Sequence, residues 1–141
     1  MSGLRTKMYE TFEHKADIGV RGKARTLEKA FCEAAKAMFS IECNIKKVKP
    51  LKKVKIECEA QNIEELFVEW LNALLAQASL HEMLFSEFFC KIKDKKLVGW
   101  AKGEKLQEKH EPKLEVKAAT YSQLKVYKQN NVWIAQCIVD V

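Results

Sequence analysis

The sequence has little glycine, proline and arginine, and it lacks a long apolar run. Its 141 residues include 5 glycines and 2 prolines, too few for a collagen-like or low-complexity chain. Its 48% hydrophobic residues exclude an intrinsically disordered chain and suffice for a sizeable core. The length is typical of one domain, so we expect a single domain over residues 1–141.

Membrane spans and secretion signals are also missing from the sequence. The most apolar stretch, residues 66–80, is interrupted by Glu69, Asn72 and Gln77, whereas a spanning helix needs about 20 apolar residues. The N-terminal segment lacks the apolar centre of a secretory signal. We therefore expect a soluble, cytoplasmic protein with no membrane contact.

Residues that form disulfides or soft metal sites are few and scattered. The cysteines are odd in number and never form a CxxC or CxxxC pair, which excludes a disulfide framework and a zinc ribbon. His14, His81 and His110 are too dispersed for a ligand set, so we interpret each as a surface or capping residue. We expect the cysteines to act as small buried apolar residues. They are Cys32, Cys43, Cys58, Cys90 and Cys137.

Lysine, in contrast, is abundant. The formal net charge is +6, and only Arg5, Arg21 and Arg25 are arginines among the 25 basic residues. Nucleic-acid recognition favours the bidentate guanidinium, whereas lysine also serves ordinary surface solubility. We interpret the densest lysine run, residues 46–55, as a solvated loop and strand face rather than as a surface for RNA or an acidic partner.

Two amphipathic helices are indicated by the spacing of apolar residues. Apolar residues recur every three or four positions over residues 26–39, with Thr26 as the N-cap. A longer apolar stripe covers residues 63–80, where Asn62 and Glu65 have the spacing of a capping box. These two segments are the main helices that we expect.

Alternating apolar and polar residues predict strands in most of the remaining chain. Residues 93–96 and 129–131 have the composition of hairpin turns. Helices and strands occur in mixed order, without a strand–helix–strand repeat. We therefore predict an α+β fold, in which mostly antiparallel sheet carries the two helices on one face. The expected strands are residues 9–13, 17–24, 53–60, 84–92, 97–102, 114–121, 123–127 and 132–140.

Common catalytic and nucleotide-binding motifs are absent from the sequence. It contains no Walker loop, no GxGxxG and no GxSxG. Two aspartates at strand ends remain as candidates: Asp17 opens an expected strand, and Asp140 closes the last one directly before Val141. A strand that runs to the last residue keeps the terminal carboxylate close to Asp140.

Three carboxylates in one place would need a cation. Two negative groups about 4 Å apart repel by about 4 kcal/mol at an effective dielectric near 20. A hard cation reverses the sign of this interaction, and its preferred ligands are oxygens. From the residues alone, a site of Asp17, Asp140 and the carboxylate of Val141 competes with a simpler interpretation, in which these are solvated groups at turns and chain ends.

Six blocks of the sequence resemble the archease family, and they follow the family's order. Examples are HKADIG around the first aspartate, VEWLNALL in the longer helix and IVDV at the last strand. Together the blocks span residues 9 to 141, which is far more specific than any one block. They lie at residues 14–19, 26–39, 68–75, 84–88, 115–121 and 138–141.

The resemblance implies a chaperone-like accessory protein of the GTP-dependent RNA ligase that joins 2′,3′-cyclic-phosphate and 5′-hydroxyl ends in tRNA splicing and RNA repair. Such a protein is not an enzyme. It contacts the ligase transiently and promotes its guanylylation and multiple turnover, so that the ligase uses GTP, tRNA is met only indirectly, and DNA is not a partner. The resemblance also implies a metal site at Asp17, Asp140 and Val141, with Ca²⁺ expected and Mg²⁺ or Mn²⁺ as alternatives.

Two positions depart from the family pattern. Lys15 stands where the family commonly has threonine, and Ser122 stands where it has a histidine after the tyrosine of the central strand. A role that depends on that histidine does not transfer to this chain. Neither position belongs to the metal site.

Two other classes of function stay open. A small hydrolase would pair a cysteine with His14, for which the sequence has no local signature. A small basic RNA-binding module would rely on the lysine blocks alone, because Trp100 and Trp133 are expected to pack rather than to stack on bases. The cysteines that a hydrolase could use are Cys32, Cys58 and Cys137.

Overall fold

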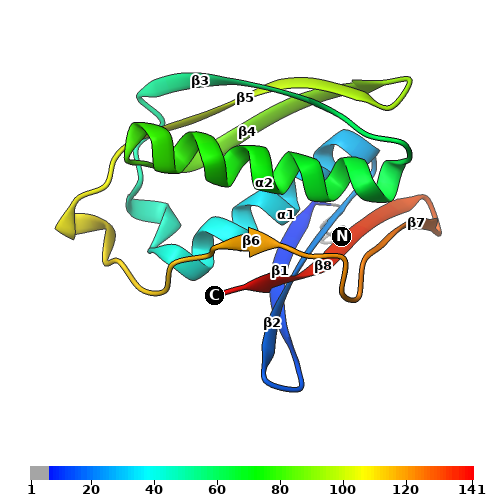
Figure 1. The fold of residues 1–141 in the computed structure, drawn as a ribbon, viewed down its shortest axis with the longest axis horizontal. Helices are drawn as coiled ribbons and strands as arrows, with labels where there is room; N and C mark the ends of the chain where they lie inside the picture. Colours follow the sequence, from blue (N-terminus) through cyan, green and yellow to red (C-terminus); the bar gives the residue numbers. More distant parts are fainter. Residues whose placement is uncertain (1–6) are drawn as a thin grey trace, which may run out of the picture.

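Two antiparallel sheets enclose two helices in the computed structural model, which describes residues 7–141 (Figure 1). Residues 1–6 of the predicted domain lie outside this description. The five-stranded sheet contains β1 (Met8–His14), β2 (Asp17–Ala24), β6 (Ala118–Ala119), β7 (Lys125–Gln129) and β8 (Val132–Asp140). The three-stranded sheet contains β3 (Lys52–Glu59), β4 (Met83–Lys93) and β5 (Lys96–Lys105). The helices are α1 (Leu27–Glu42) and α2 (Ile63–His81), and the 3₁₀ turns η1 (Ile45–Lys47) and η2 (Glu108–His110) lie in connections.

The last strand lies inside the five-stranded sheet. The strand order is β1-β2-β8-β6, and β7 also pairs with β8. β8 therefore has β2 along one edge, and β6 and β7 along the other. This topology places β2 between the first strand, β1, and the last strand, β8.

Both helices begin at the caps that the sequence predicts. The hydroxyl of Thr26 accepts a hydrogen bond from the N–H of Lys29 (3.1 Å), and the side chain of Asn62 accepts one from the N–H of Glu65 (2.8 Å). The longer helix stops at Glu82, which adopts a left-handed backbone with φ 54°. Each end is thus fixed by a local hydrogen bond or backbone conformation.

Helix α1 packs against both sheets. A Cβ atom at Gly22 of β2 would collide with the backbone of Ala30 and Ala34, so only glycine allows this close approach of helix and strand. On the other side of the helix, the Phe39 ring lies 5.5 Å from the Phe85 ring of β4. The hydrophobic core therefore lies between the two sheets.

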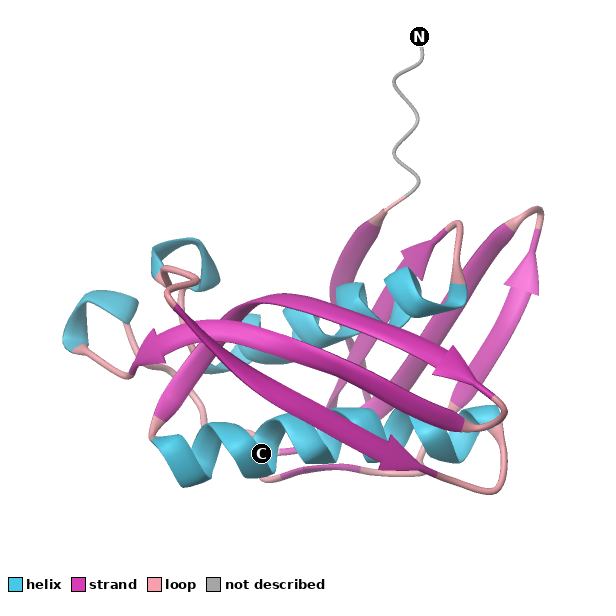
Figure 2. Cartoon of the chain, turned by 90° about the horizontal axis from the view of Figure 1, so that it is seen from above, coloured by secondary structure: helices cyan, strands magenta, loops and turns pink. Residues whose placement is uncertain are grey.

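Helix α2 is tied to α1 by a buried tryptophan. The indole N–H of Trp70 donates a hydrogen bond to the carbonyl of Phe31 over 3.0 Å, and both side chains are fully buried. Both helices lie beneath the three-stranded sheet in the view of Figure 2. In the described part of the chain, no helix is both long and apolar enough to cross a membrane.

The predicted fold class is confirmed. The chain forms an α+β domain with antiparallel sheets, and helices cover one face of each sheet. Two strands, residues 17–24 and 132–140, have the predicted bounds. Asn130 and Asn131 adopt left-handed backbone (φ 53° and 64°), which confirms the asparagine turn before β8. The helices extend slightly beyond the predicted residues, to Glu42 and His81.

The predicted strand at residues 114–121 is wrong for most of its length, because only Ala118–Ala119 form a strand. Its backbone N–H groups are divided between β8, which accepts from Lys117 and Thr120, and side chains of the two helices. The N–H of Val116, for example, donates to the side chain of Glu42 over 2.9 Å. A backbone N–H that donates to a helix side chain is not available for a ladder with a neighbouring strand.

Candidate functional site

The β1–β2 hairpin places Asp17 at one end of the five-stranded sheet. Its turn contains Lys15, which adopts a left-handed backbone with φ 57°. His14 and Asp17 face each other as the last residue pair of the hairpin. Directly opposite side chains of an antiparallel pair lie on the same face, so His14 is the nearest cross-strand neighbour of Asp17.

Strand β8 brings Asp140 to the same end of the sheet. In the antiparallel register of β2 and β8, Ile18 pairs with Val139. Asp17 and Asp140 are the next residues of the two strands, one step beyond this last pair, so their side chains lie on the same face of the sheet. On its other side, Asp140 pairs with Ala118 of β6. The structure thus brings together two aspartates that lie at opposite ends of the sequence.

The backbone around Asp140 is held firmly by its neighbours. The N–H of Lys117 donates to the carbonyl of Asp140 over 2.7 Å. Asn72 of α2 holds β6 through two hydrogen bonds with the backbone of Ala119, at 2.8 Å and 3.2 Å. The end of β8 therefore has a defined position, set by a helix and by a second strand.

The carboxylates at this end are exposed and unneutralised. The side chains of Asp17 and Asp140 are exposed, and Val141 is 41% exposed. Within residues 7–141, neither aspartate is part of an ion pair. In the same residues, no three side chains of His, Cys, Asp or Glu gather in a way that could hold a metal ion. A metal site here would need the carboxylate of Val141 as its third anionic ligand, and it stays a prediction.

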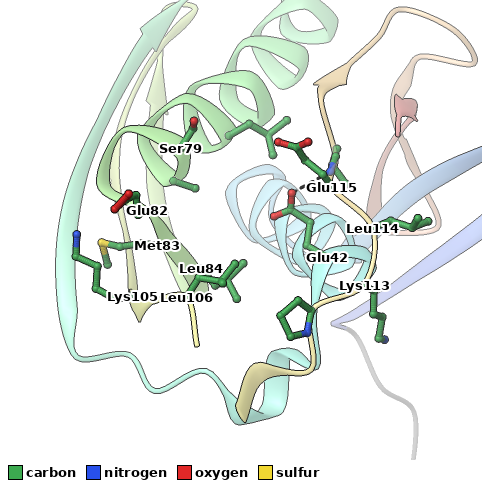
Figure 3. A pocket seen from close by; sticks show the side chains of 14 residues that line it. Glu42, Ser79, Glu82, Met83, Leu84, Lys105, Leu106, Lys113, Leu114 and Glu115 are labelled. Carbon is green, nitrogen blue, oxygen red and sulfur yellow. Dashed lines mark hydrogen bonds between the residues drawn. The ribbon is translucent and has the colours of Figure 1, made fainter. Parts of the chain in front are cut away.

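A cavity of about 590 Å³ lies beside the segment that leads to this site (Figure 3). Its walls include the half-buried side chain of Glu42 at the end of α1 and residues 112–116. Burial raises the pKa of Glu42, and nearby Glu115 acts in the same direction, whereas the hydrogen bond from Val116 lowers it. This environment favours a proton or a cationic group at Glu42.

The cysteine–histidine pair that a hydrolase would need is not assembled. Cys137 belongs to the core on the inner face of β8, whereas His14 pairs with Asp17 on the outer face of the same sheet. Burial also raises the pKa of Cys137 to about 12 and that of Cys58 to about 11, so both thiols are protonated at neutral pH. Cys43, Cys90 and Cys137 are buried as expected, and Cys32 and Cys58 are half-buried.

The sequence did not predict the buried polar pair of His110 and Glu104. His110 is fully buried rather than at the surface, and its Nε2 lies 2.9 Å from the carboxylate of Glu104. Its Nδ1 accepts the N–H of Gln107 over 3.0 Å, so it does cap a turn, as the sequence analysis allowed. The pKa of Glu104 is lowered to about 2, first by the hydrogen bond from the N–H of Lys49 and then by that from His110. The two residues are six positions apart, and no local pattern in the sequence indicates that they form a pair.

The two tryptophans in strands have different environments. Trp133 packs against the core, as predicted. The prediction for Trp100 is wrong, because its side chain is only half-buried and lies on the outer face of the three-stranded sheet. Residues 97–101 carry no polar side chain on either side of the strand, so alternation alone did not determine which side faces the core.

The sequence and fold match known proteins over nearly the whole chain. The family model of the archease protein family (MTH1598/TM1083) matches residues 9–141. Protein archease of Pyrococcus furiosus is 39% identical over 141 residues, which cover 96% of this chain and 99% of that protein.

Solved structures support the same assignment. Protein 1598 of Methanobacterium thermoautotrophicum has a TM-score of 0.81 and 32% sequence identity, over 94% of this chain and 98% of that one. An archease of Thermotoga maritima, described as a possible chaperone, has a TM-score of 0.63 over 92% of this chain and 94% of that one. At 20% identity, this second likeness shows the fold alone. On the family match and the 39% identity together, this chain belongs to the archease protein family.

Proposed function

We propose that this chain is a non-catalytic accessory protein of the GTP-dependent RNA ligase that acts in tRNA splicing and RNA repair. Membership of the archease family supports an accessory role, and the resemblance of the sequence blocks implies this partner. In the proposal, the chain contacts the ligase transiently in the cytoplasm and promotes its guanylylation and multiple turnover. The ligase uses the GTP, and tRNA is met through the ligase.

The observation that carries the proposal is the register of β2 and β8, whose last pair, Ile18 and Val139, is directly adjacent to Asp17 and Asp140. All three candidate ligands, these two side chains and the carboxylate of Val141, are oxygen donors. Oxygen donors suit a hard divalent cation, so we propose Ca²⁺, with Mg²⁺ or Mn²⁺ as alternatives. When bound, such a cation supplies the positive charge that offsets the repulsion of the carboxylates.

The chain's own residues position this site rather than perform chemistry. Lys117 and Asn72 fix the backbone on one side of Asp140, and the β1–β2 hairpin fixes Asp17 on the other. The side chains stay exposed, so a partner protein can reach them.

The proposal is tested by adding the protein at substoichiometric amounts to its cognate ligase. We expect more RNA joined per ligase molecule and a larger fraction of covalent ligase–guanylate. The chain alone should join no RNA, and the ligase alone should stop after few turnovers. Equal turnover with and without the chain, at several GTP concentrations, would contradict the proposal.

A further inference from the structure

The outer face of the three-stranded sheet is uncovered and rich in lysine. Both helices pack on the opposite face, as Figure 2 shows. In the register of β3, β5 and β4, the outward positions carry three glutamates, three apolar residues and six lysines. The lysines are Lys53, Lys55, Lys91, Lys93, Lys96 and Lys102. We call this surface the outer face.

Two aromatic rings lie at the centre of the outer face. Phe89 and Trp100 are directly opposite on β4 and β5, with ring centroids 5.6 Å apart and planes 23° apart. Phe89 is 41% exposed, and the adjacent Val98 is 50% exposed. Single exposed apolar residues are common, but a contiguous apolar patch with a polar rim marks an interaction site.

The lysines surround these rings closely. The ammonium groups of Lys53 and Lys102 lie 5.2 Å and 4.7 Å from the centre of the Trp100 ring. Together with Lys91, they have no carboxylate within ion-pair distance among residues 7–141. A hollow of about 460 Å³ lies between the rings and the lysines Lys53, Lys55 and Lys91. The outer face thus combines flat aromatic surface with free positive charge.

We propose that the outer face binds single-stranded RNA, with bases stacked on Phe89 and Trp100 and backbone phosphates on the surrounding lysines. Stacking on aromatic side chains inside a positively charged groove is how proteins hold single strands without reading their sequence. RNA-recognition sheets also present rings from neighbouring strands to bases. An acidic protein surface would need only the lysines and would leave the exposed ring pair without a role.

The inference goes beyond the proposed role with the ligase, and it is tested on the isolated chain. The probes are fluorescein-labelled 12-nucleotide uridylate and adenylate RNAs, with fluorescence anisotropy and intrinsic tryptophan fluorescence as readouts. We expect both RNAs to bind with similar affinity and to quench tryptophan emission. Trp70 is buried and Trp133 packs against the core from the other sheet, so a Trp100→Phe variant should lose most of this quenching while it still binds.

The aromatic rings are tested with a matched control. The Phe89→Thr/Trp100→Thr variant should bind both RNAs about tenfold or more weakly. Tyr127→Thr, on β7 of the other sheet, removes a ring of similar exposure (39%) and should bind as the wild type does. Circular dichroism checks the fold of both variants.

The charges are tested by the salt dependence of binding. Lys53→Gln/Lys91→Gln should lower the slope of log affinity against log salt by roughly 0.7 per lost phosphate contact. The same change at two exposed lysines of the other sheet, Lys125→Gln/Lys128→Gln, should leave the slope unchanged. Equal losses in both variants would indicate attraction by net charge alone and overturn the proposal.

Two other outcomes would also overturn the proposal. The first is binding of a 12-residue polyglutamate peptide as tight as that of the RNAs, with no tryptophan quenching by either, which would assign the outer face to an acidic protein partner. The second is RNA binding that the ring variant leaves intact.

Discussion

Both sheets of this molecule are antiparallel and carry helices on one face, but they differ in the contacts that their outward side chains make. In the five-stranded sheet, the guanidinium of Arg21 lies 4.3 Å above the Phe12 ring and bonds to the side chains of Gln136 and Glu10. The Phe12 ring itself fills the space above Gly19. Cation and ring are therefore engaged within the sheet. In the three-stranded sheet, Lys53 and Lys102 also lie over a ring, that of Trp100, but among residues 7–141 neither lysine has a carboxylate within ion-pair distance.

This difference separates two surfaces of opposite charge. The five-stranded sheet presents carboxylates at one end, where β2 starts and β8 stops. The three-stranded sheet presents lysines across its outer face. An antiparallel sheet that carries helices on one side can therefore bind a ligand either at the end of its strands or on its uncovered face. Which of the two is available depends on whether the outward side chains already contact one another.

The largest effect is expected at the acidic end, by which we mean Asp17, Asp140 and the carboxylate of Val141. Asp140→Asn should reduce ligase stimulation and Ca²⁺ affinity at least about tenfold, because it removes one of three anionic ligands. A C-terminal extension should act as strongly, since it converts the carboxylate of Val141 to an amide. Turnover assays and calorimetry measure both effects.

The control for this prediction lies in the other sheet. Asp94→Asn changes an exposed carboxylate in a β4–β5 turn position with φ 50°, which asparagine tolerates. It should stimulate the ligase normally, as should an N-terminally tagged chain. Without metal, Asp140→Asn should melt no lower than the wild type, because it relieves repulsion. Normal stimulation and Ca²⁺ binding by the extended chain would rule out the carboxylate site.

The next effect concerns the free energy of unfolding and compares Trp70, which is buried between the sheets, with Trp100, which lies on the outer face. Trp70→Phe leaves the buried carbonyl of Phe31 without its donor and should lower the free energy of unfolding by about 1–3 kcal/mol. Trp100→Phe, on the outer face, should change it by less than about 0.5 kcal/mol. Urea denaturation measures both values. Equal losses would mean that Trp100 is also part of the core.

The smallest effect concerns the buried pair at the end of β5. The folded state lowers the pKa of Glu104 to about 2 from an ordinary value of 4.5, so its charge stabilises the fold above pH 4.5, and this contribution is lost as the pH falls toward 2. Glu104→Gln should therefore lower the melting temperature at pH 7, because glutamine cannot carry this charge. The gap to the wild type should close between pH 4.5 and 2. A gap that does not depend on pH would show that shape, not charge, matters there.

Local chemistry made much of the fold predictable. Thr26 and Asn62 cap helices through their own side chains, and Asn130 and Asn131 supply the left-handed backbone of a two-residue turn. Each of these features depends on residues within three or four positions. The predicted helix starts and the bounds of β8 followed from such local signals.

What could not be predicted depends on contacts between distant residues. The segment before β6 bonds to Glu42, and His110 bonds to Glu104 inside the protein, so neither feature has a local signature. The side of β5 that faces the core was also undetermined, which misplaced Trp100. At the candidate site, the residues themselves suggested Asp17 and Asp140, but only the strand register indicates that both lie at the same end of the five-stranded sheet.

The position of β8 inside its sheet also affects the order in which the two sheets form during folding. Arg21 and Gln136 are hydrogen-bonded neighbours, yet 115 positions separate them, whereas β4 and β5 form a hairpin. Contacts so distant form late, because loop closure costs entropy before the contact is gained. A chain interrupted before β8 can still pair β3, β4 and β5, but it carries only half of the acidic end. Asp17 and Asp140 therefore come together only in a molecule whose β8 has joined the sheet, and a partner that needs both aspartates would recognise the folded sheet rather than either strand alone.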